Sequence, residues 1–349
     1  MEPRKTTGPL TGAKTRNRRK TEHVLACLDD GVDRSLDSFA AWKLRYNALP
    51  DLSLEAVATA STFCGQAIAA PIIISAMTGG ADRELARLNR NLAEGAEALG
   101  LPLSLGSAKV ALEDSAARDS FRLRQWAPTV PLIANLGLVS FNYDVGLEAL
   151  DSVRELVEPD VFGLHLNALQ EAIQEGGDTD FRGMEDHLRA IRQACPLPLL
   201  VKECGGGLAP EVVGRLAALG VDYIDVSGAD GTSWAAVEGQ LSADPSLGEL
   251  FRDFGLPTAW ILEHLTAGQR GAARIIAGGG IRNGLQAAKA LALGARYVSV
   301  ARPFLLAAND SAEAVVALGQ RLMRELRTAM FLSGAGDLNA LRREQLLRL

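Results

Sequence analysis

Eight short apolar runs, separated mostly by helix-length segments, constrain the fold of this chain more than any other feature of its sequence. They occupy residues 71–77, 102–107, 131–137, 161–166, 198–203, 222–228, 274–280 and 296–301. Strands that are joined by helices run parallel, and continuously apolar strands imply a sheet that is covered on both faces. Eight such repeats favour an α/β fold of the closed (β/α)8 TIM-barrel type over an open doubly wound sheet.

The rest of the chain extends this barrel at two places. Residues 1–18 are polar and basic, which predicts a disordered tail. Residues 19–349 are then expected to form a single barrel domain with an N-terminal extension. The interval between the sixth and seventh runs is the longest, so residues 235–260 are expected to form an insertion over the barrel mouth.

Charge and cysteine content exclude several classes of function. The net charge of −6 argues against general nucleic-acid binding. Four scattered cysteines, without a Cys-x-x-Cys pair, fit a reducing cytosol and indicate neither a zinc site nor a disulfide framework. No apolar run reaches the ~18 residues that suggest a membrane span. We therefore expect a cytoplasmic protein without nucleic-acid or membrane partners.

Polar groups gather where the fourth predicted strand ends. His165 and Asn167 flank Leu166, and alternate residues of a strand point to the same face. Gln170 and Glu171 follow at the start of the next helix. Barrel enzymes keep their chemistry at the C-terminal ends of the strands, which makes these four residues a candidate site. A half-buried strand with an ordinary buried histidine is the alternative for this stretch alone.

Basic and glycine-rich segments indicate a bound phosphate. Glycines 278–280 follow the seventh predicted strand and precede a helix, and Ala301-Arg302 follows the eighth. Barrels commonly bind phosphate at these two loops, where glycines allow close approach and the helix N-terminus attracts anions. Near the N-terminus, Arg19 and His23 share one helix face with Lys20 adjacent, which also suits a phosphate. Lys202 ends the fifth strand and suits an anionic cofactor ring or a Schiff base.

These segments, in their order along the chain, resemble a known family. The resemblance rests on Arg19-Lys20-x-x-His23 and on residues 75–80, 134–137, 165–171, 201–203, 225–228, 231–234 and 279–282. Together they are similar to the motifs of type 2, flavin-dependent isopentenyl diphosphate isomerases. The match runs from about Arg19 to the C-terminus.

The resemblance implies an FMN-dependent isomerase that interconverts isopentenyl and dimethylallyl diphosphates in isoprenoid biosynthesis. The flavin would work in its reduced form, NADPH would be the reductant, and Mg²⁺ would bind the diphosphate. A homo-oligomer, a tetramer or octamer, is also implied.

The same resemblance assigns roles to residues. His165, Asn167 and Gln170 would be catalytic, and Glu171 would hold the metal. Substrate would be bound by Arg19, Lys20, His23, Ser107 and Gln170. FMN would be bound by Ala76, Met77, Thr78, Ser107, Asn135, Lys202, Ser227, Thr232, Gly279, Gly280, Arg282, Ala301 and Arg302.

The chain departs from the pattern of the family at three places. Ala108-Lys109 stands where Gln-Arg is expected, which removes one diphosphate contact but keeps a positive charge. Asp230 replaces a glycine and is expected to add a negative charge near the flavin, which could weaken binding. Gly278 replaces a serine and is expected to lose only a hydroxyl group.

Two alternatives share some of these features. An FMN-barrel oxidoreductase acting on a hydroxy acid or nucleotide would have the same flavin and phosphate loops. It would lack the combination of Arg19-Lys20-x-x-His23 with residues 165–171. A flavin-binding protein without turnover is suggested only by Ala108 and Asp230.

Overall fold

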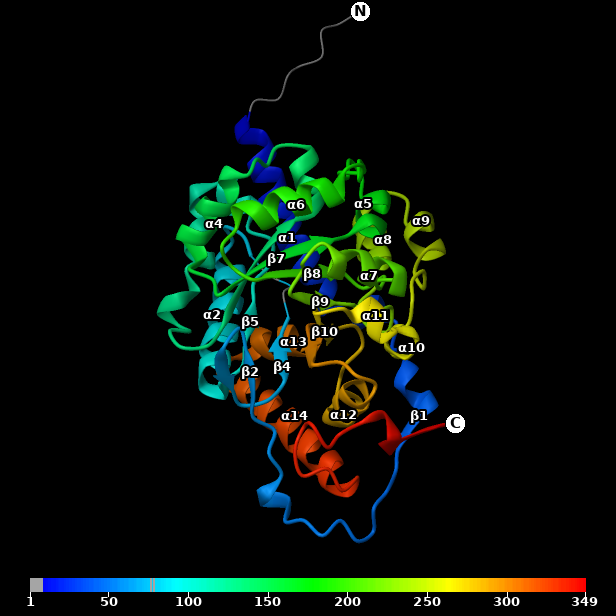
Figure 1. Cartoon of the computed structure of the whole chain (residues 1–349). Coiled ribbons are helices and arrows are strands. Elements are labelled where there is room, and N and C mark those ends of the chain that lie inside the picture. The colour runs from blue at the N-terminus through cyan, green and yellow to red at the C-terminus, as the bar shows by residue number, and fades with distance from the viewer. Residues whose placement is uncertain (1–8, 76, 78) are drawn as a thin grey trace, which may run out of the picture.

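The computed structural model describes residues 9–75, 77 and 79–349, and these contain a closed barrel of eight parallel strands (Figure 1). Each strand lies within one of the eight predicted runs, so the (β/α)8 prediction is confirmed. The strands are β4 (Ile72–Ile74), β5 (Leu103–Ser104), β6 (Leu132–Gly137), β7 (Val161–Leu166), β8 (Leu199–Glu203), β9 (Tyr223–Asp225), β10 (Arg274–Ala277) and β11 (Tyr297–Val300). The barrel closes where β11 pairs with β4.

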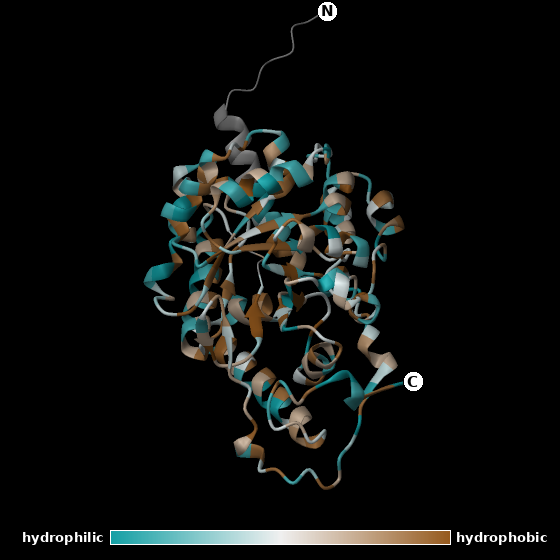
Figure 2. Ribbon diagram, viewed as in Figure 1, coloured by the Kyte–Doolittle hydropathy of each residue, from teal (hydrophilic) through white to brown (hydrophobic). Residues whose placement is uncertain are grey.

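Amphipathic helices cover the outside of the barrel. In α2 (Arg83–Leu99), Leu85, Leu88 and Leu92 are buried at helical spacing, and Asp82 accepts a hydrogen bond from a backbone N–H in the first turn. Figure 2 shows apolar residues concentrated on the barrel strands, with polar residues on the surrounding helices. The other long outer helices are α4 (Glu148–Val157), α6 (Met184–Ala194), α7 (Pro210–Ala218), α12 (Gly284–Ala292), α13 (Arg302–Asp310) and α14 (Ala312–Leu332).

The sequence of residues 115–126 predicts a helix between the second and third barrel strands, and this prediction is wrong. The segment near residues 115–126 forms the 3₁₀ turns η4 (Ser115–Phe121) and η5 (Leu123–Gln125), after a short α3 (Lys109–Glu113). The side chain of Asp114 accepts a hydrogen bond from the N–H of Ala116, which ends α3 and starts the tighter turn. A short aspartate side chain competes in this way with continuation of an α-helix.

A small hairpin closes the N-terminal end of the barrel. It consists of β2 (Ser61–Phe63) and β3 (Gln66–Ile68). Phe63 is fully buried and contacts the rings of Tyr223 and Tyr297, with ring centroids 4.6 and 5.2 Å apart. Cys64 and Gly65 both have positive φ, at 43° and 86°, as tight hairpin turns require. This hairpin does not cover the opposite, C-terminal end of the barrel, where the cavity described below lies.

The N-terminal extension crosses the C-terminal end of the barrel. It begins with α1 (Pro9–Leu28), so the backbone is helical well before residue 18, and the boundary expected there falls inside a helix. Residues 1–8 lie outside the described part of the chain. After α1 come η1 (Asp30–Val32) and η2 (Ser38–Ala41), and then β1 (Trp42–Leu44), which pairs with the C-terminal β12 (Leu346–Arg348). We call residues 18–41 the N-terminal arm.

The insertion after the sixth barrel strand packs beside this arm. It contains α8 (Trp234–Leu241), α9 (Ser246–Leu250) and α10 (Thr258–His264). Helix α8 contacts both α1 and α5 (Ala168–Ile173), which follows β7. The predicted insertion at residues 235–260 lies in these helices. No helix in the described part of the chain is both long and apolar enough to cross a membrane.

Candidate active site

A cavity of about 550 Å³ lies at the C-terminal ends of the barrel strands, a size typical of small-ligand sites. It brings together the three basic residues of α1, the polar groups after β7, and the loops after β8 to β11. The predicted residues that line it are Arg19, Lys20, His23, Met77, Ser107, Asn135, His165, Asn167, Gln170, Glu171, Lys202, Ser227, Thr232, Gly279, Gly280, Arg282, Ala301 and Arg302. Ala76 and Thr78, the other two predicted flavin contacts, lie outside the described residues.

Glu171 lies at one end of this cavity with its carboxylate already oriented. Its Oε1 accepts a hydrogen bond from Asn167 Nδ2 at 2.7 Å, and its Oε2 accepts from the backbone N–H of Asp178 at 2.8 Å. Burial raises the pKa of Glu171. Asn167 is 3% exposed, and its Oδ1 has no hydrogen-bond partner among the described residues. A buried acceptor beside an oriented carboxylate suits a hydrated cation or a ligand donor.

The described residues contain no cluster of three or more histidine, cysteine or acidic side chains that could enclose a metal. Mg²⁺ does not need such a cage, because it is commonly held by one or two carboxylates, water and substrate phosphate oxygens. Glu171 therefore fits a single-carboxylate magnesium site that a diphosphate would complete.

Gln170 and His23 both approach Glu238, a buried glutamate that the sequence analysis did not identify. Its Nε2 donates to Oε1 of Glu238 at 2.8 Å, and His23 Nε2 lies 2.9 Å from the same oxygen. Glu238 is only 4% exposed and projects from the insertion helix α8. It follows Trp234 by one helical turn, and Trp234 meets the His23 ring edge-on with centroids 5.4 Å apart. Glu238 is the one charged residue of α8 and shares a face with Trp234, and this was the available signal.

His165 and Lys202 lie at the ends of β7 and β8 and line the same cavity as Gln170 and His23. His165 Nδ1 lies 3.0 Å from Asn135 Oδ1, and burial, with Lys202 and Lys20 nearby, holds the pKa of His165 well below its usual value. The imidazole is therefore neutral near pH 7. Burial alone would lower the pKa of Lys202, but Cys204 and Asp225 beside it raise the pKa. Lys202 is therefore a positive charge that can face an anionic group.

The loops after β9 and β10 form a close-packed glycine cradle. Gly279 and Gly280 have φ of 92° and 76°, a region that disfavours residues with a side chain. A Cβ on Gly279 would overlap the carbonyl oxygen of Gly228, and one on Gly231 would lie 2.9 Å from the nitrogen of Gly280. Only bare backbone fits here, which suits a phosphate group bound by N–H donors, as FMN requires.

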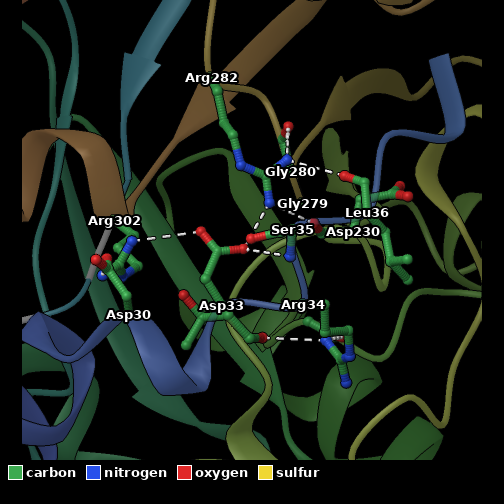
Figure 3. A network of polar contacts seen from close by, with 12 residues as sticks. Asp30, Asp33, Arg34, Ser35, Leu36, Asp230, Gly279, Gly280, Arg282 and Arg302 are labelled. Atoms are coloured by element: carbon green, nitrogen blue, oxygen red, sulfur yellow. Dashed lines mark hydrogen bonds and ion pairs between the residues drawn. The ribbon is translucent and has the colours of Figure 1, made fainter. Parts of the chain in front are cut away.

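The side chains of Arg282 and Arg302 hold the N-terminal arm (Figure 3). Arg282 Nη2 donates to Asp33 Oδ1 at 2.6 Å, and Arg302 Nη1 lies 3.3 Å from Asp33 Oδ2. Arg302 Nη2 also donates to Asp30 at 2.7 Å. Both arginines line the cavity, so a contact with FMN remains a prediction for them, alongside this structural role.

The structure shows the surroundings of Asp230, Lys109 and Gly278, which depart from the family pattern. Asp230 is 1% exposed, and its Oδ2 accepts from Ser38 Oγ at 2.8 Å and from the N–H of Thr258 at 2.6 Å. Its charge is thus compensated by local donors, and Asp230 is not among the residues that line the cavity.

Lys109 lies on the cavity wall, where Nζ is 3.2 Å from Asp178 Oδ2. The expectation that Gly278 loses only a hydroxyl is wrong. A Cβ at this position would overlap Asp225 Oδ1 and lie 2.5 Å from Ser299 Oγ. Ser299 itself donates to Asp225 Oδ2 at 2.7 Å, so this hydroxyl occupies the space that a serine at position 278 would need.

Comparison with known proteins decides the family. The FMN-dependent dehydrogenase family model matches residues 156–348. The isopentenyl-diphosphate delta-isomerase of Paracoccus zeaxanthinifaciens is 43% identical over 326 residues, covering 92% of this chain and 93% of that protein. The enzyme of the same name from a Synechococcus strain is 41% identical, covering 97% of this chain and 99% of that protein. This chain belongs to the type 2, FMN-dependent isopentenyl-diphosphate delta-isomerase family.

Solved structures share the fold of this delta-isomerase family member. A flavocytochrome b2 variant superposes with a TM-score of 0.70 at 17% identity, covering 99% of this chain and 88% of that one. A mandelate oxidase variant gives a TM-score of 0.66 at 20% identity, covering 95% of this chain and 97% of that one. At such low identity these two similarities concern the fold alone. The predicted family and barrel are confirmed.

Proposed function

We propose that this protein interconverts isopentenyl and dimethylallyl diphosphates with bound FMN in its reduced form. One observation carries the proposal. The basic face of α1, the polar groups after β7 and the glycine cradle line the same cavity. A hydroxy-acid oxidoreductase on the same barrel has no need for a second phosphate-binding face opposite the flavin loops. Relatives about 40% identical over nearly the whole chain bear the isomerase name.

The diphosphate end of the substrate would lie between α1 and Glu171. Arg19, Lys20 and Lys109 supply positive charge on that side of the cavity. Burial lowers the pKa of Lys20, and a bound diphosphate would favour its charged form. Glu171 would hold Mg²⁺ against the diphosphate oxygens, with Asn167 fixing the orientation of the carboxylate.

Moving the double bond requires that a proton be added at one carbon and removed from another. Bound reduced FMN would supply a ring that can exchange a proton with the substrate. Gln170 has no titratable group, so its role is orientation: it donates to Glu238 and lies 3.3 Å from Asn167 Nδ2. Glu238 and His23 lie beside it, with His23 Nε2 2.9 Å from Glu238 Oε1. His165, being neutral, can hydrogen-bond without adding a charge.

Several finer features of the proposal rest on the resemblance to the family. We include NADPH as the reductant, a cytoplasmic location and a homo-oligomer of four or eight chains. Four cysteines without a disulfide, two of them buried, are compatible with a reducing compartment.

The direct experiment combines the purified protein with FMN, Mg²⁺ and isopentenyl diphosphate under anaerobic reduction by NADPH. We expect dimethylallyl diphosphate to accumulate. The same protein should leave (S)-mandelate and (S)-lactate unchanged when it is assayed with oxidised FMN. Hydroxy-acid oxidation without isomerisation would overturn the proposal in favour of the oxidoreductase alternative.

A further inference from the structure

Asp33 joins the N-terminal arm to both loops that are predicted to bind the flavin phosphate (Figure 3). Its side chain is 13% exposed and bridges Arg282, after β10, and Arg302, the first residue of α13 after β11. Burial opposes ionisation, but the hydrogen bonds from Arg282 and from the N–H of Ser35 lower the pKa of Asp33. The carboxylate is therefore charged between two guanidinium groups at neutral pH.

The residues on either side of Asp33 are hydrogen-bonded to the loops after β8 and β9. The N–H of Arg34 donates to the carbonyl of Gly231 at 3.0 Å, and the N–H of Ser233 donates to that of Val32 at 2.8 Å. The guanidinium of Arg34 donates to the carbonyls of Gly205 and Arg252, at 2.8 and 2.7 Å. These contacts fix one side of the arm without Asp33. The loops after β10 and β11 reach the arm through Arg282 and Arg302, which also donate to the carbonyls of Leu36 and Cys27. Among the hydrogen bonds and ion pairs of the described residues, Asp33 is the arm residue that both arginines share.

Arg302, which pairs with Asp33, also contacts the C-terminal end of α1. Its Nε donates to the carbonyl of Cys27 at 2.9 Å, and its Nη2 lies 3.4 Å from the carbonyl of Leu28. These are the last residues of α1, where free carbonyls attract a cation. At about 1.5 Å of rise per residue, Cys27 lies only ~6 Å along the helix from His23. The position of Arg302 therefore influences where the basic face of α1 lies.

We propose that Asp33 is a positioning residue: by bridging Arg282 and Arg302 it fastens the arm to the flavin-phosphate loops and holds the basic face of α1 over the substrate. This inference rests on the proposed function for the identity of the substrate. It assigns Asp33 no direct contact with substrate. It predicts that loss of the Asp33 charge weakens substrate binding while the chemistry of the bound substrate continues.

An alternative role for the Asp33 carboxylate predicts a different effect on the binding of FMN and substrate. If Asp33 occupied the place of the flavin phosphate on the two arginines, FMN would have to displace it. Removing the charge would then tighten FMN binding and leave the affinity for the substrate unchanged. The direction and the location of the effect therefore separate a positioning residue from a competing anion.

The test uses Asp33→Asn, with Asp30→Asn as the matched control. Asp30 lies on the same arm and also pairs with Arg302, but its side chain is 97% exposed, so its ion pair contributes little. For Asp33→Asn we expect KM for isopentenyl diphosphate to rise about tenfold or more, a common size for coupling between sites. Both kcat and the Kd for FMN should stay within about threefold of wild type. Asp30→Asn should match wild type in all three.

Hydrogen exchange of the FMN-bound protein gives a readout that does not depend on turnover. Exchange in peptides that cover residues 18–38 should be faster in Asp33→Asn than in Asp30→Asn. Asp33→Glu, which keeps the charge, should recover most of the protection and most of the substrate affinity. If the isomerase assay fails for wild type, this difference in exchange still tests the attachment of the arm.

Three results would overturn the positioning role. The first is equal behaviour of Asp33→Asn and Asp30→Asn in both KM and hydrogen exchange. The second is tighter FMN binding in Asp33→Asn with KM unchanged, which would establish the competing anion. The third is an equal loss in Asp33→Glu and Asp33→Asn, which would show that the charge does not hold the arm.

Discussion

Two glutamates at the mouth of the barrel are held by different kinds of donor, and this difference separates scaffold from site. Glu203 accepts hydrogen bonds from the backbone N–H groups of Gly205, Gly206 and Gly207, so it shapes the loop after β8. Glu171 accepts mainly from amide side chains, including Gln174 Nε2 at 3.1 Å, although both glutamates line the cavity. Side chains can rearrange around an incoming cation, whereas the backbone of a tight loop cannot.

Replacement of Glu171 by glutamine is therefore expected to separate metal-dependent activity from flavin binding. A neutral amide is a poor ligand for Mg²⁺, so activity should fall about 100-fold or more. Affinity for FMN, measured by flavin fluorescence, should stay near that of wild type. Glu175→Gln, an exposed neighbour, is the control and should retain wild-type activity. Equal loss of FMN binding and activity in Glu171→Gln would contradict the metal role.

The neutral state of His165 predicts a pH dependence of stability. Because its pKa in the folded protein lies well below 6.5, the unfolded chain takes up this proton first as pH falls. Stability should be fully retained above about pH 6.5 and should decline below it, toward the lower pKa of the folded state. Urea midpoints between pH 8 and 5 measure this decline, which should be shallower in His165→Gln. A His165 NMR resonance that titrates at 6.5 or above would contradict the prediction.

The two ends of the barrel are formed by different elements, the glycine cradle at the C-terminal end and the β2–β3 hairpin at the N-terminal end. The glycine cradle after β10 forms part of the mouth, where two loops pack backbone against backbone without room for a side chain. The β2–β3 hairpin forms the floor, where Phe63 packs on Tyr223 and Tyr297. The mouth is thus built for binding and the floor for stability, which is the usual division in this fold.

A side chain in the cradle should cost flavin affinity. In Gly279→Ala, the Cβ would overlap the carbonyl oxygen of Gly228, so the loop must move away from the phosphate. Loss of one charged hydrogen bond, about 1.5–3 kcal/mol, corresponds to about tenfold or more in the Kd for FMN. Gly65→Ala is the matched control, because Gly65 also has positive φ but has open space around it. An unchanged Kd in Gly279→Ala would contradict the cradle.

Truncation of the floor should reduce stability without affecting the site. Phe63→Ala removes a fully buried ring, which typically lowers the free energy of unfolding by about 3–5 kcal/mol. The neighbouring Thr62→Ala changes an exposed side chain and should cost only about 0.5 kcal/mol. Chemical denaturation of the FMN-bound proteins measures both. A loss below about 1 kcal/mol in Phe63→Ala would show that the hairpin does not close the barrel.

At the scale of the whole molecule, the sequence predicts the barrel better than the segments that close it. Continuous apolar runs such as residues 131–137 identify buried strands because their hydrophobic pattern is long and uninterrupted. The β2–β3 hairpin has strands of only three residues and a Cys-Gly turn, so its pattern is too short to read. Residues 115–126 were misassigned because Asp114 stops the helix locally.

Some residues of the site could be predicted from the sequence, and others could not. Residues at strand ends, such as His165 and Lys202, follow from counting strands, because parallel strands bring their ends to one mouth. The place of Glu238 depends on how the insertion folds back over β7, and the partners of Arg282 lie on an arm about 250 residues earlier. Motif spacing cannot give such contacts, because they depend on tertiary packing between distant segments.

We propose that this cavity moves a double bond without net oxidation or reduction. The most direct test counts dimethylallyl diphosphate formed against NADPH consumed, under anaerobic conditions with FMN and Mg²⁺. We expect many molecules of product for each NADPH oxidised, and the same equilibrium mixture when dimethylallyl diphosphate is the starting material. Consumption of one NADPH for each substrate converted, or no conversion while reduced flavin is bound, would contradict it.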